Sequence, residues 1–307
     1  MASTLSVVIP TLNDSTLPRT LQAVMEQTRA ADEIIVVGRD ENGVAGRFPR
    51  VRFVDTGKPV CAAVARNCGI AESRGQIIVF TDADCIPETD WLEQHERAHC
   101  QGARVAGGGV SVASENYWVL SDNVSMFHDF VRELPPGERS LLPTLNLSVQ
   151  RSVVEEVGLM DESFPGAAAE DSDWTIRMRL AGYRLQFVPA AVVHHAPSRT
   201  RWKDVVGHWR KSGFSGIRVR HRYAQDYATP AFARSALMLR LLSPFIAARV
   251  TAGIYSDLVF WPYWRCLPVI YLTKIIYCLG AAAAIDNGFA FDTQRVGSQG
   301  SGPGLAL

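Results

Sequence analysis

The sequence lacks several patterns that would place it in familiar classes of protein. Its six cysteines form no Cys-x-x-Cys pair and have no metal-site spacing, so we expect reduced, mostly buried thiols as in a cytoplasmic protein. No basic segment precedes the first apolar run, TLSVVIP, which is too short for a secretory leader. No G-x-G-x-x-G follows this run, which argues against a dinucleotide-dependent oxidoreductase. With 47% apolar residues, the composition is that of a globular protein with a sizeable core.

Net charge is also absent, but the charges are unevenly distributed. Counted along the sequence, residues 1–196 contain 17 Lys and Arg against 26 Asp and Glu, a net charge of −9. Residues 197–225 contain eight against one, and residues 226–307 contain six against four, which gives +7 and +2. The chain is therefore an acidic body followed by a short basic segment and a weakly charged apolar region. We expect no nucleic-acid partner.

Apolar runs alternate with helical patterns through most of the chain. The expected strands are 5–10, 32–38, 51–55, 76–84 and 104–112, with a strand or loop from 144 and a strand pair over 183–197. The expected helices are 18–29, 60–75 and 169–182, with another ending near 158. Because the first strands are apolar on both faces, they predict a mostly parallel sheet covered by helices, an α/β fold.

Two carboxylates end a strand that should be buried. Asp82 and Asp84 follow the run IIVF, and their alternate spacing points both side chains to the same side of an extended backbone. In open α/β sheets, ligands bind at the carboxyl ends of the strands. A solvated turn would explain the pair if it stood alone, but burying two unpaired charges would cost several kcal/mol.

A second acidic cluster, Glu170-Asp171-Ser172-Asp173, begins a later helix. Helix capping and an i, i+4 pair between Asp173 and Arg177 would explain one or two of these acids. Neither explains why His194-His195 ends a strand soon afterwards. Carboxylates together with histidine suit a divalent cation such as Mg²⁺ or Mn²⁺, whose remaining positions substrate phosphates could fill.

The order of these motifs resembles that of family 2 glycosyltransferases. The segments SVVIPTLND, ARNCGIAESRGQIIVFTDADCIPETDWL, TLNLSVQRSVVEEVGLMDESF and EDSDWTIRMRLAGYRLQFVPAAVVHH carry the resemblance, over roughly residues 4–215. The resemblance implies a GT-A fold, which is Rossmann-like, and an inverting transfer of a hexose-type sugar. It also implies a nucleotide-sugar donor, an acceptor hydroxyl on a saccharide or lipid-linked molecule, and a divalent metal. Cell-surface polysaccharide or glycolipid synthesis would be the setting.

The same resemblance assigns roles to the acidic motifs. Asp171 corresponds to the general base and Glu170 to its neighbour. Asp84 and His195 correspond to the metal ligands, and Asp82 to a donor contact. In this mechanism the base takes the proton of the attacking hydroxyl, and the metal offsets the charge of the leaving diphosphate.

Further assignments follow the flanking segments of the family pattern. Those on the donor side are Pro10, Thr11, Asn13, Asp40, Arg66 and Asn67, and those on the acceptor side are Trp174 and Arg177. The basic segment offers Arg210 and Lys211 as contacts of the diphosphate. We expect acceptor recognition in variable loops around residues 113–143, whose sequence has no pattern that we can interpret.

The sequence departs from the family pattern in two places. Gly38 and Arg39 stand where the family has acids that read the nucleobase, and Asp40 is displaced by two positions. A UDP-sugar is still favoured as donor, with GDP- and dTDP-sugars left open. The glycine before the ED motif is also replaced, by Ala168-Ala169.

Two other functions remain open at this point. A nucleotidyltransferase acting on a sugar phosphate would also be α/β with metal-binding acids, but it normally has a Gly- and Lys-rich loop after the first strand, and PTLNDSTLP has none. A non-catalytic scaffold that binds nucleotide sugars is the other alternative. The complete set of DxD, ED and His motifs favours an enzyme over both.

The C-terminal third combines basic and apolar segments. Residues 199–222 contain eight Lys and Arg, and apolar stretches follow at 236–250 and 258–285. Residues 266–285 are just long enough to span a membrane, but Lys274 near their middle argues against a simple span. Trp261, Tyr263 and Trp264 are residue types that favour a membrane interface.

From these patterns we expect three parts. Residues 1–225 would form the catalytic domain, 226–290 a membrane-associating helical region, and 291–307, which is rich in Gly and Ser, a disordered tail. We expect the enzyme on the cytoplasmic face of the cell membrane, with helices lying in the inner leaflet. True spans and a homo-oligomer interface are the alternatives.

Overall fold

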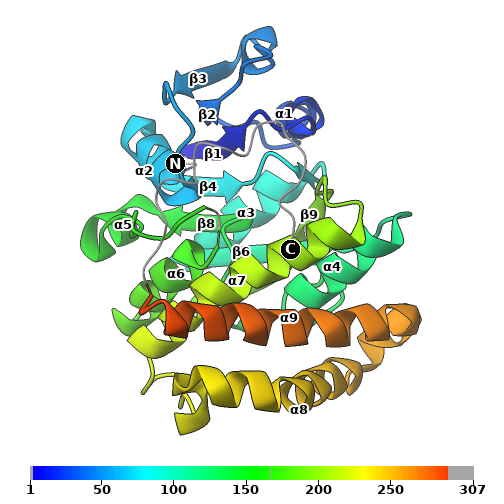
Figure 1. The fold of residues 1–307 in the computed structure, drawn as a ribbon. Helices are drawn as coiled ribbons and strands as arrows, with labels where there is room; N and C mark the ends of the chain where they lie inside the picture. Colours follow the sequence, from blue (N-terminus) through cyan, green and yellow to red (C-terminus); the bar gives the residue numbers. More distant parts are fainter. Residues whose placement is uncertain (1–2, 167, 290–307) are drawn as a thin grey trace.

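The computed structural model describes residues 3–166 and 168–289 (Figure 1). Its described part contains one nine-stranded sheet with the order β3-β2-β1-β4-β8-β6-β9-β5, and β7 lies beside β9. The strands are β1 (Leu5–Leu12), β2 (Glu33–Arg39), β3 (Val51–Asp55), β4 (Ile77–Thr81), β5 (Cys85–Pro87), β6 (Val105–Ser111), β7 (Gly137–Glu138), β8 (Asn146–Gln150) and β9 (Leu185–His195). The expected α/β fold is confirmed. The tail from residue 291 lies outside the described residues.

The four strands β3-β2-β1-β4 are parallel, as their apolar sequences predict, and the sheet is mixed beyond β4. The helices are α1 (Leu17–Met25), α2 (Ala62–Glu72), α3 (Trp91–Cys100), α4 (Tyr117–Phe127), α5 (Arg151–Val157), α6 (Glu170–Leu180), α7 (Trp202–Arg222), α8 (Ala236–Tyr255) and α9 (Leu267–Asp286). Short 3₁₀ segments occur at η1 (Ala45–Arg47), η2 (Ala231–Arg234) and η3 (Leu258–Cys266). Figure 1 shows α7, α9 and α8 stacked in that order beside the sheet.

The segment 183–197 contains one long strand, β9 (Leu185–His195), and not the expected pair. β9 pairs in parallel with β6, and its register shifts between Gly108 and Gly109, which pair with Val188 and Val192. The three intervening residues of β9 bulge at this point. A bulge accommodates Pro189, Ala190 and Ala191 without breaking the strand.

The segment 113–143 contains helix α4, which the sequence pattern did not predict. Asn116 caps the helix by accepting hydrogen bonds from the backbone N–H groups of Trp118 and Val119. The helix is hard to recognise because much of its buried face is polar. Buried side chains on α4 include Ser121, Asp122, Asn123 and Ser125.

Gly38, one of the two departures from the family pattern, is required by the backbone. It lies at the end of β2, where it pairs with Thr11 of β1. Its φ is +136°, and a Cβ atom there would lie 1.9 Å from the carbonyl oxygen of Thr11. Only glycine fits such a close approach. The acid expected at this position is therefore excluded by packing at the edge where the donor is expected.

The C-terminal helices pack directly on the rest of the protein. Gly213 of α7 and Gly280 of α9 let the two helix backbones meet, because a Cβ atom at either position would lie 2.0–2.1 Å from a carbonyl oxygen of the other helix. Lys274 of α9 is buried, donates a hydrogen bond to the carbonyl oxygen of Ser125 (2.8 Å) and lies 4.4 Å from the ring centre of Trp209. The boundary proposed near residue 225 falls in the turn after α7 and separates two parts that share a packed interface.

This close approach of α7 and α9 can be tested with two glycines of one helix. We expect Gly213→Ala to destabilise the protein by about 1–3 kcal/mol, because the methyl group forces the backbones apart. Gly207→Ala, at a position of α7 with open space, should be neutral or stabilise by about 0.5–1 kcal/mol. Urea unfolding measures both free energies. Equal effects of the two substitutions would contradict the packing of α9 on α7.

Candidate active site

Two acidic motifs from distant parts of the chain meet at one buried arginine. Asp82 follows β4, and Glu170 begins α6. Arg66 of α2 donates from Nη2 to Asp82 Oδ1 (2.6 Å) and from Nη1 to Glu170 Oε1 (2.7 Å), and its side chain is 3% exposed. Burial opposes the charge of Arg66, but the carboxylates of Asp82, Glu170 and Asp171 raise its pKa above the usual value.

The two members of the ED motif lie in different environments. Glu170 is buried, and burial together with the charge of Asp171 raises its pKa to about 7 although Arg66 opposes the rise. Asp171 is only half-buried, and its Oδ1 accepts a hydrogen bond from the backbone N–H of Ser172 (2.7 Å). Burial raises the pKa of Asp171 too, against the effect of Arg66. Of the two acids, Asp171 is therefore the one that an incoming molecule can reach.

The backbone before this motif adopts an uncommon conformation. Ala169 has φ +75°, in the left-handed region that non-glycine residues seldom occupy. It lies at the N-cap of α6, directly before Glu170. An alanine thus adopts a backbone conformation that suits glycine. Such strain is most often found at functional sites.

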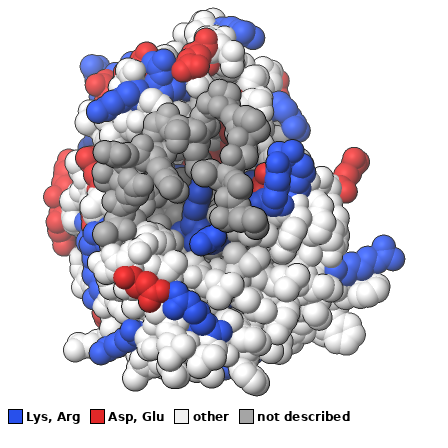
Figure 2. Space-filling view, viewed as in Figure 1, with Lys and Arg blue, Asp and Glu red and all other residues white. Residues whose placement is uncertain are grey.

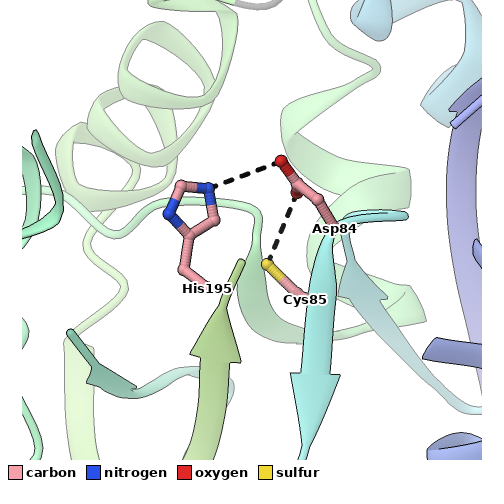
Figure 3. Close-up of side chains that lie close together, drawn as sticks. All are labelled: Asp84, Cys85 and His195. Atoms are coloured by element: carbon pink, nitrogen blue, oxygen red, sulfur yellow. Dashed lines mark hydrogen bonds and ion pairs between the residues drawn. The ribbon is translucent and has the colours of Figure 1, made fainter. Parts of the chain in front are cut away.

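Asp84 and His195 face each other at the edge of the sheet (Figure 3). Asp84 Oδ2 lies 3.6 Å from His195 Nε2, and Cys85, whose Sγ is 3.9 Å from Asp84 Oδ1, pairs with His195 across β5 and β9. Burial lowers the pKa of His195 well below its usual value, so the ring is neutral. Burial also raises the pKa of Asp84 to about 7, and Asp82 and Asp14 add to this rise while Arg199 opposes it.

These donors fit a divalent cation. A neutral imidazole and a carboxylate are ligands that Mn²⁺ and Mg²⁺ accept, and Asp84, Cys85 and His195 place one donor atom each within 4.8 Å of one another. A cation between Asp84 and His195 would also remove the electrostatic cost that raises the pKa of Asp84. Its other positions would be open to oxygen atoms of a substrate.

Arg199 is a residue that the sequence interpretation missed. It follows β9 by four residues, and its Nε donates to Asp122 Oδ2 (2.9 Å), which is also held by Trp209. Its charge lowers the pKa values of both Asp84 and His195, so it lies beside this pair. The feature of the sequence that could have identified Arg199 is its position shortly after the strand that ends with His195. Arg210 and Lys211, which the sequence suggested instead, are exposed on α7.

Residues expected on the donor side lie at the ends of β1 and β2. Thr11 is buried, and its hydroxyl has no hydrogen-bond partner among the described residues. Asn13 has φ +55° and accepts a hydrogen bond from the backbone N–H of Glu41 (2.8 Å). Asp40 accepts one from the backbone N–H of Ala45 (2.7 Å). Pro10 precedes them on β1. The polar groups of this edge thus shape the turns after the two strands.

Three of the expected site residues have structural contacts instead. Asn67 binds the backbone of Met160 through both its amide nitrogen and its amide oxygen. Trp174 is fully buried and donates from Nε1 to the carbonyl oxygen of Gly158 (2.8 Å). Arg177 pairs with Asp173 and donates to the carbonyl oxygens of Val157 and Leu159. The side chains of Trp174 and Arg177 therefore hold α6 in place, in contrast to the acceptor role expected for them.

The fold is that of GT-A glycosyltransferases. The structure is similar to the mannosyltransferase PcManGT of Pyrobaculum calidifontis, solved with GDP-Man and Mn²⁺, with a TM-score of 0.63 and 17% identity over 93% of this chain and 87% of that one. It is also similar to GalNAc-T7, solved with UDP, GalNAc and Mn²⁺, with a TM-score of 0.52 and 16% identity over 68% of this chain and 47% of that one.

Sequence comparison identifies the family. The model of glycosyl transferase family 2 matches residues 6–147, and that of glycosyl transferase family group 2 matches residues 77–285. Glycosyltransferase AglE of Haloferax volcanii is 31% identical over 65% of this chain and 69% of its own length. The pre-mycofactocin glycosyltransferase of Mycobacterium tuberculosis is 32% identical, over 52% of this chain and 35% of its own length. The chain belongs to the family 2 glycosyltransferases.

Removing the carboxylate of Asp84 from its pair with His195 should weaken the binding of a cation. We expect Asp84→Asn to lower the affinity for Mn²⁺ at least tenfold, as counted by electron paramagnetic resonance of the free ion. Stability without metal should not fall, because burial opposes the charge of Asp84. Glu88→Gln is the matched control, since Glu88 directly follows β5 and contacts His194 of β9 (3.2 Å). Equal Mn²⁺ affinity of the Asp84 variant and the control would exclude this pair as the metal site.

Proposed function

We propose that this family 2 glycosyltransferase transfers a sugar from a nucleoside diphosphate sugar to an acceptor hydroxyl, with inversion at the anomeric carbon. The observation that carries the proposal is the position of Asp171. It is the half-exposed acid of a cluster in which Arg66 links the ED motif to Asp82, next to the pair of Asp84 and His195. A base, a buried arginine and a candidate cation site are thereby brought to one edge of the sheet.

Asp171 is the general base of this mechanism. As the acceptor oxygen forms its bond to the anomeric carbon, its proton passes to Asp171 and the bond to the diphosphate oxygen breaks, so that the diphosphate leaves with the electron pair. General-base catalysis of this kind is worth about 10²–10⁴ in rate. A single displacement inverts the anomeric centre and needs no carboxylate nucleophile. Arg66 keeps Glu170 in place beside the base and offsets part of the negative charge.

The leaving diphosphate would be stabilised at the other end of the cluster. A divalent cation, Mn²⁺ or Mg²⁺, held by Asp84 and His195 would offset the charge that develops on it. Arg199 adds positive charge from the protein, and the described residues give its Nη atoms no partner. This makes Arg199 a better candidate for contact with the diphosphate than Arg210 or Lys211, which are exposed on α7.

A UDP-sugar is the donor that we favour. The nucleobase is expected at the ends of β1 and β2, near Thr11, Asn13 and Asp40. Arg39, where the family pattern has an acid, is bound by Asp55 (2.8 Å), so the reading of a pyrimidine falls to Asp40 or to the backbone. One of the two similar structures binds UDP and the other GDP-Man, and competition among UDP, GDP and dTDP decides between these donors.

The C-terminal helices support membrane association. Two helical segments in the described part, Ala236–Tyr255 and Leu258–Asp286, are long and apolar enough to cross a membrane by length and composition. The second is half-buried inside the protein, with Lys274 packed against Ser125 and Trp209. The arrangement therefore favours helices that lie in the surface of the bilayer over true spans.

The exposed face of these helices is apolar. Large exposed side chains are Leu237, Leu241 and Phe245 on α8 and Leu258, Trp261 and Trp264 on η3. Figure 2 shows a mostly uncharged surface over these lower helices. Arg240, Arg249 and Arg265 lie on the same helices and are exposed, a combination that favours an anionic lipid surface. We propose the cytoplasmic face of the membrane as the place of action, with a saccharide or lipid-linked acceptor.

The role of Asp171 predicts a separation between binding and turnover. Asp171→Asn should keep the affinity for UDP in the presence of Mn²⁺ within a few fold and lower kcat at least a hundredfold, because only the proton acceptor is lost. Titration calorimetry with UDP, GDP and dTDP measures the first, and release of the nucleoside diphosphate measures the second. Glu155→Gln, which neutralises an exposed acid of α5, serves as the control. Near-normal turnover of the Asp171 variant would place the base elsewhere.

The proposed membrane surface can be tested without removing any helix. Leu241→Glu combined with Phe245→Glu should shift the protein from the lipid to the soluble fraction in flotation with vesicles of neutral and anionic lipids, because charges then replace apolar side chains in the interface. Leu180→Glu, at an exposed leucine of α6, should leave flotation unchanged. Full-length protein that stays soluble with both kinds of vesicle would instead favour a subunit interface.

A further inference from the structure

The amide of Asn123 holds His195 through two hydrogen bonds. Its Nδ2 donates to the carbonyl oxygen of His195 (2.9 Å), and its Oδ1 lies 2.7 Å from His195 Nδ1. A carbonyl oxygen can only accept, so the orientation of the amide is fixed. Oδ1 then has to accept from the ring, and His195 Nδ1 carries the proton.

The protonation of the ring decides what His195 presents to Asp84. When the ring has a single proton, Asn123 holds that proton on Nδ1, which leaves Nε2 with a free lone pair. This lone pair faces Asp84 Oδ2 at 3.6 Å. When Asp84 is ionised, two groups that only accept hydrogen bonds thus point at each other, an arrangement that a cation between them satisfies.

The ring has little freedom to turn away from this position. Its side chain is 6% exposed, and Phe127 of α4 contacts it edge-on at a centroid distance of 4.9 Å. Phe127 and Asn123 are one helical turn apart on α4, so the same face of the helix supports the ring from two sides. Of these contacts, only the one with Asn123 specifies which nitrogen carries the proton.

We propose that Asn123 is a positioning residue for the metal site, which fixes His195 in the tautomer whose Nε2 binds the cation. The inference rests on the proposed function, because it concerns the same site. It assigns a role to α4, a helix in the segment where acceptor recognition was expected. Groups that fix the ring of a metal-binding histidine typically contribute 10–100-fold to metal affinity.

Substitutions that separate the two hydrogen bonds test this role. Asn123→Leu removes both, and we expect a 10–100-fold weaker affinity for Mn²⁺ alone, counted as free ion by electron paramagnetic resonance. Asn123→Asp keeps an acceptor for Nδ1–H but loses the donor to the His195 carbonyl, so it should retain affinity within about threefold even if stability falls. Ser121→Ala is the matched control, because this buried hydroxyl of α4 bonds the carbonyl oxygen of Tyr117 and the thiol of Cys266.

A spectroscopic measurement reports the tautomer without metal. In protein labelled with ¹⁵N-histidine, the His195 signals, identified by their loss in His195→Gln, should show the Nδ1–H form in the wild type and in Asn123→Asp. A mixture of tautomers is expected for Asn123→Leu.

The outcomes distinguish this inference from the proposed function. Wild-type Mn²⁺ affinity in Asn123→Leu, or equal losses in the Leu and Asp variants, would overturn the positioning role while leaving the metal site in place. Loss in Asn123→Leu with retention in Asn123→Asp supports it. Wild-type protein that binds no Mn²⁺ would overturn both proposals, and Asp84→Asn that binds Mn²⁺ normally would move the site away from this pair.

Discussion

The ion pairs of Arg66 are the constraint on which the rest of the site depends. A buried guanidinium costs several kcal/mol in lost hydration, and only well-placed carboxylates compensate for it. Asp82 and Glu170 do so here from two segments that lie 88 residues apart in the sequence. The contact therefore sets the distance between the end of β4 and the start of α6. It also leaves Asp171, the next residue, at the border between interior and solvent, where a base can meet a substrate.

Much of the fold follows from local sequence patterns. Strands β1, β2 and β4 are apolar on both faces, so their parallel pairing could be predicted, and Pro18 marks the start of α1. Helix α4 could not be predicted in the same way, because its buried face consists of Ser121, Asp122, Asn123 and Ser125. Asp122, Asn123 and Ser125 are acceptable inside because partners distant in sequence satisfy them, and a single sequence does not show such partners.

The residues of the candidate site also fall into those that can be recognised from the sequence and those that cannot. The acids and His195 are recognisable because their chemistry requires particular residue types at the ends of strands and helices. The motifs do not determine where neighbouring side chains point, so Trp174 and Arg177 were expected at the acceptor and instead hold α6 against its surroundings. Arg199 and Asn123 were missed for the converse reason. Their contacts with Asp122 and His195 depend on tertiary packing that no local motif records.

Trp209 connects the C-terminal layer to the site. Its indole N–H holds Asp122, which binds Arg199, while Lys274 of α9 lies against the face of the same ring. The helix with the longest apolar stretch is thus three contacts from Arg199, the cationic group beside Asp84 and His195. At the proposed membrane surface, a detergent that replaces lipid around α8 and α9 would act on the support of that group. The choice of detergent is for this reason a variable of the enzymology as well as of the purification.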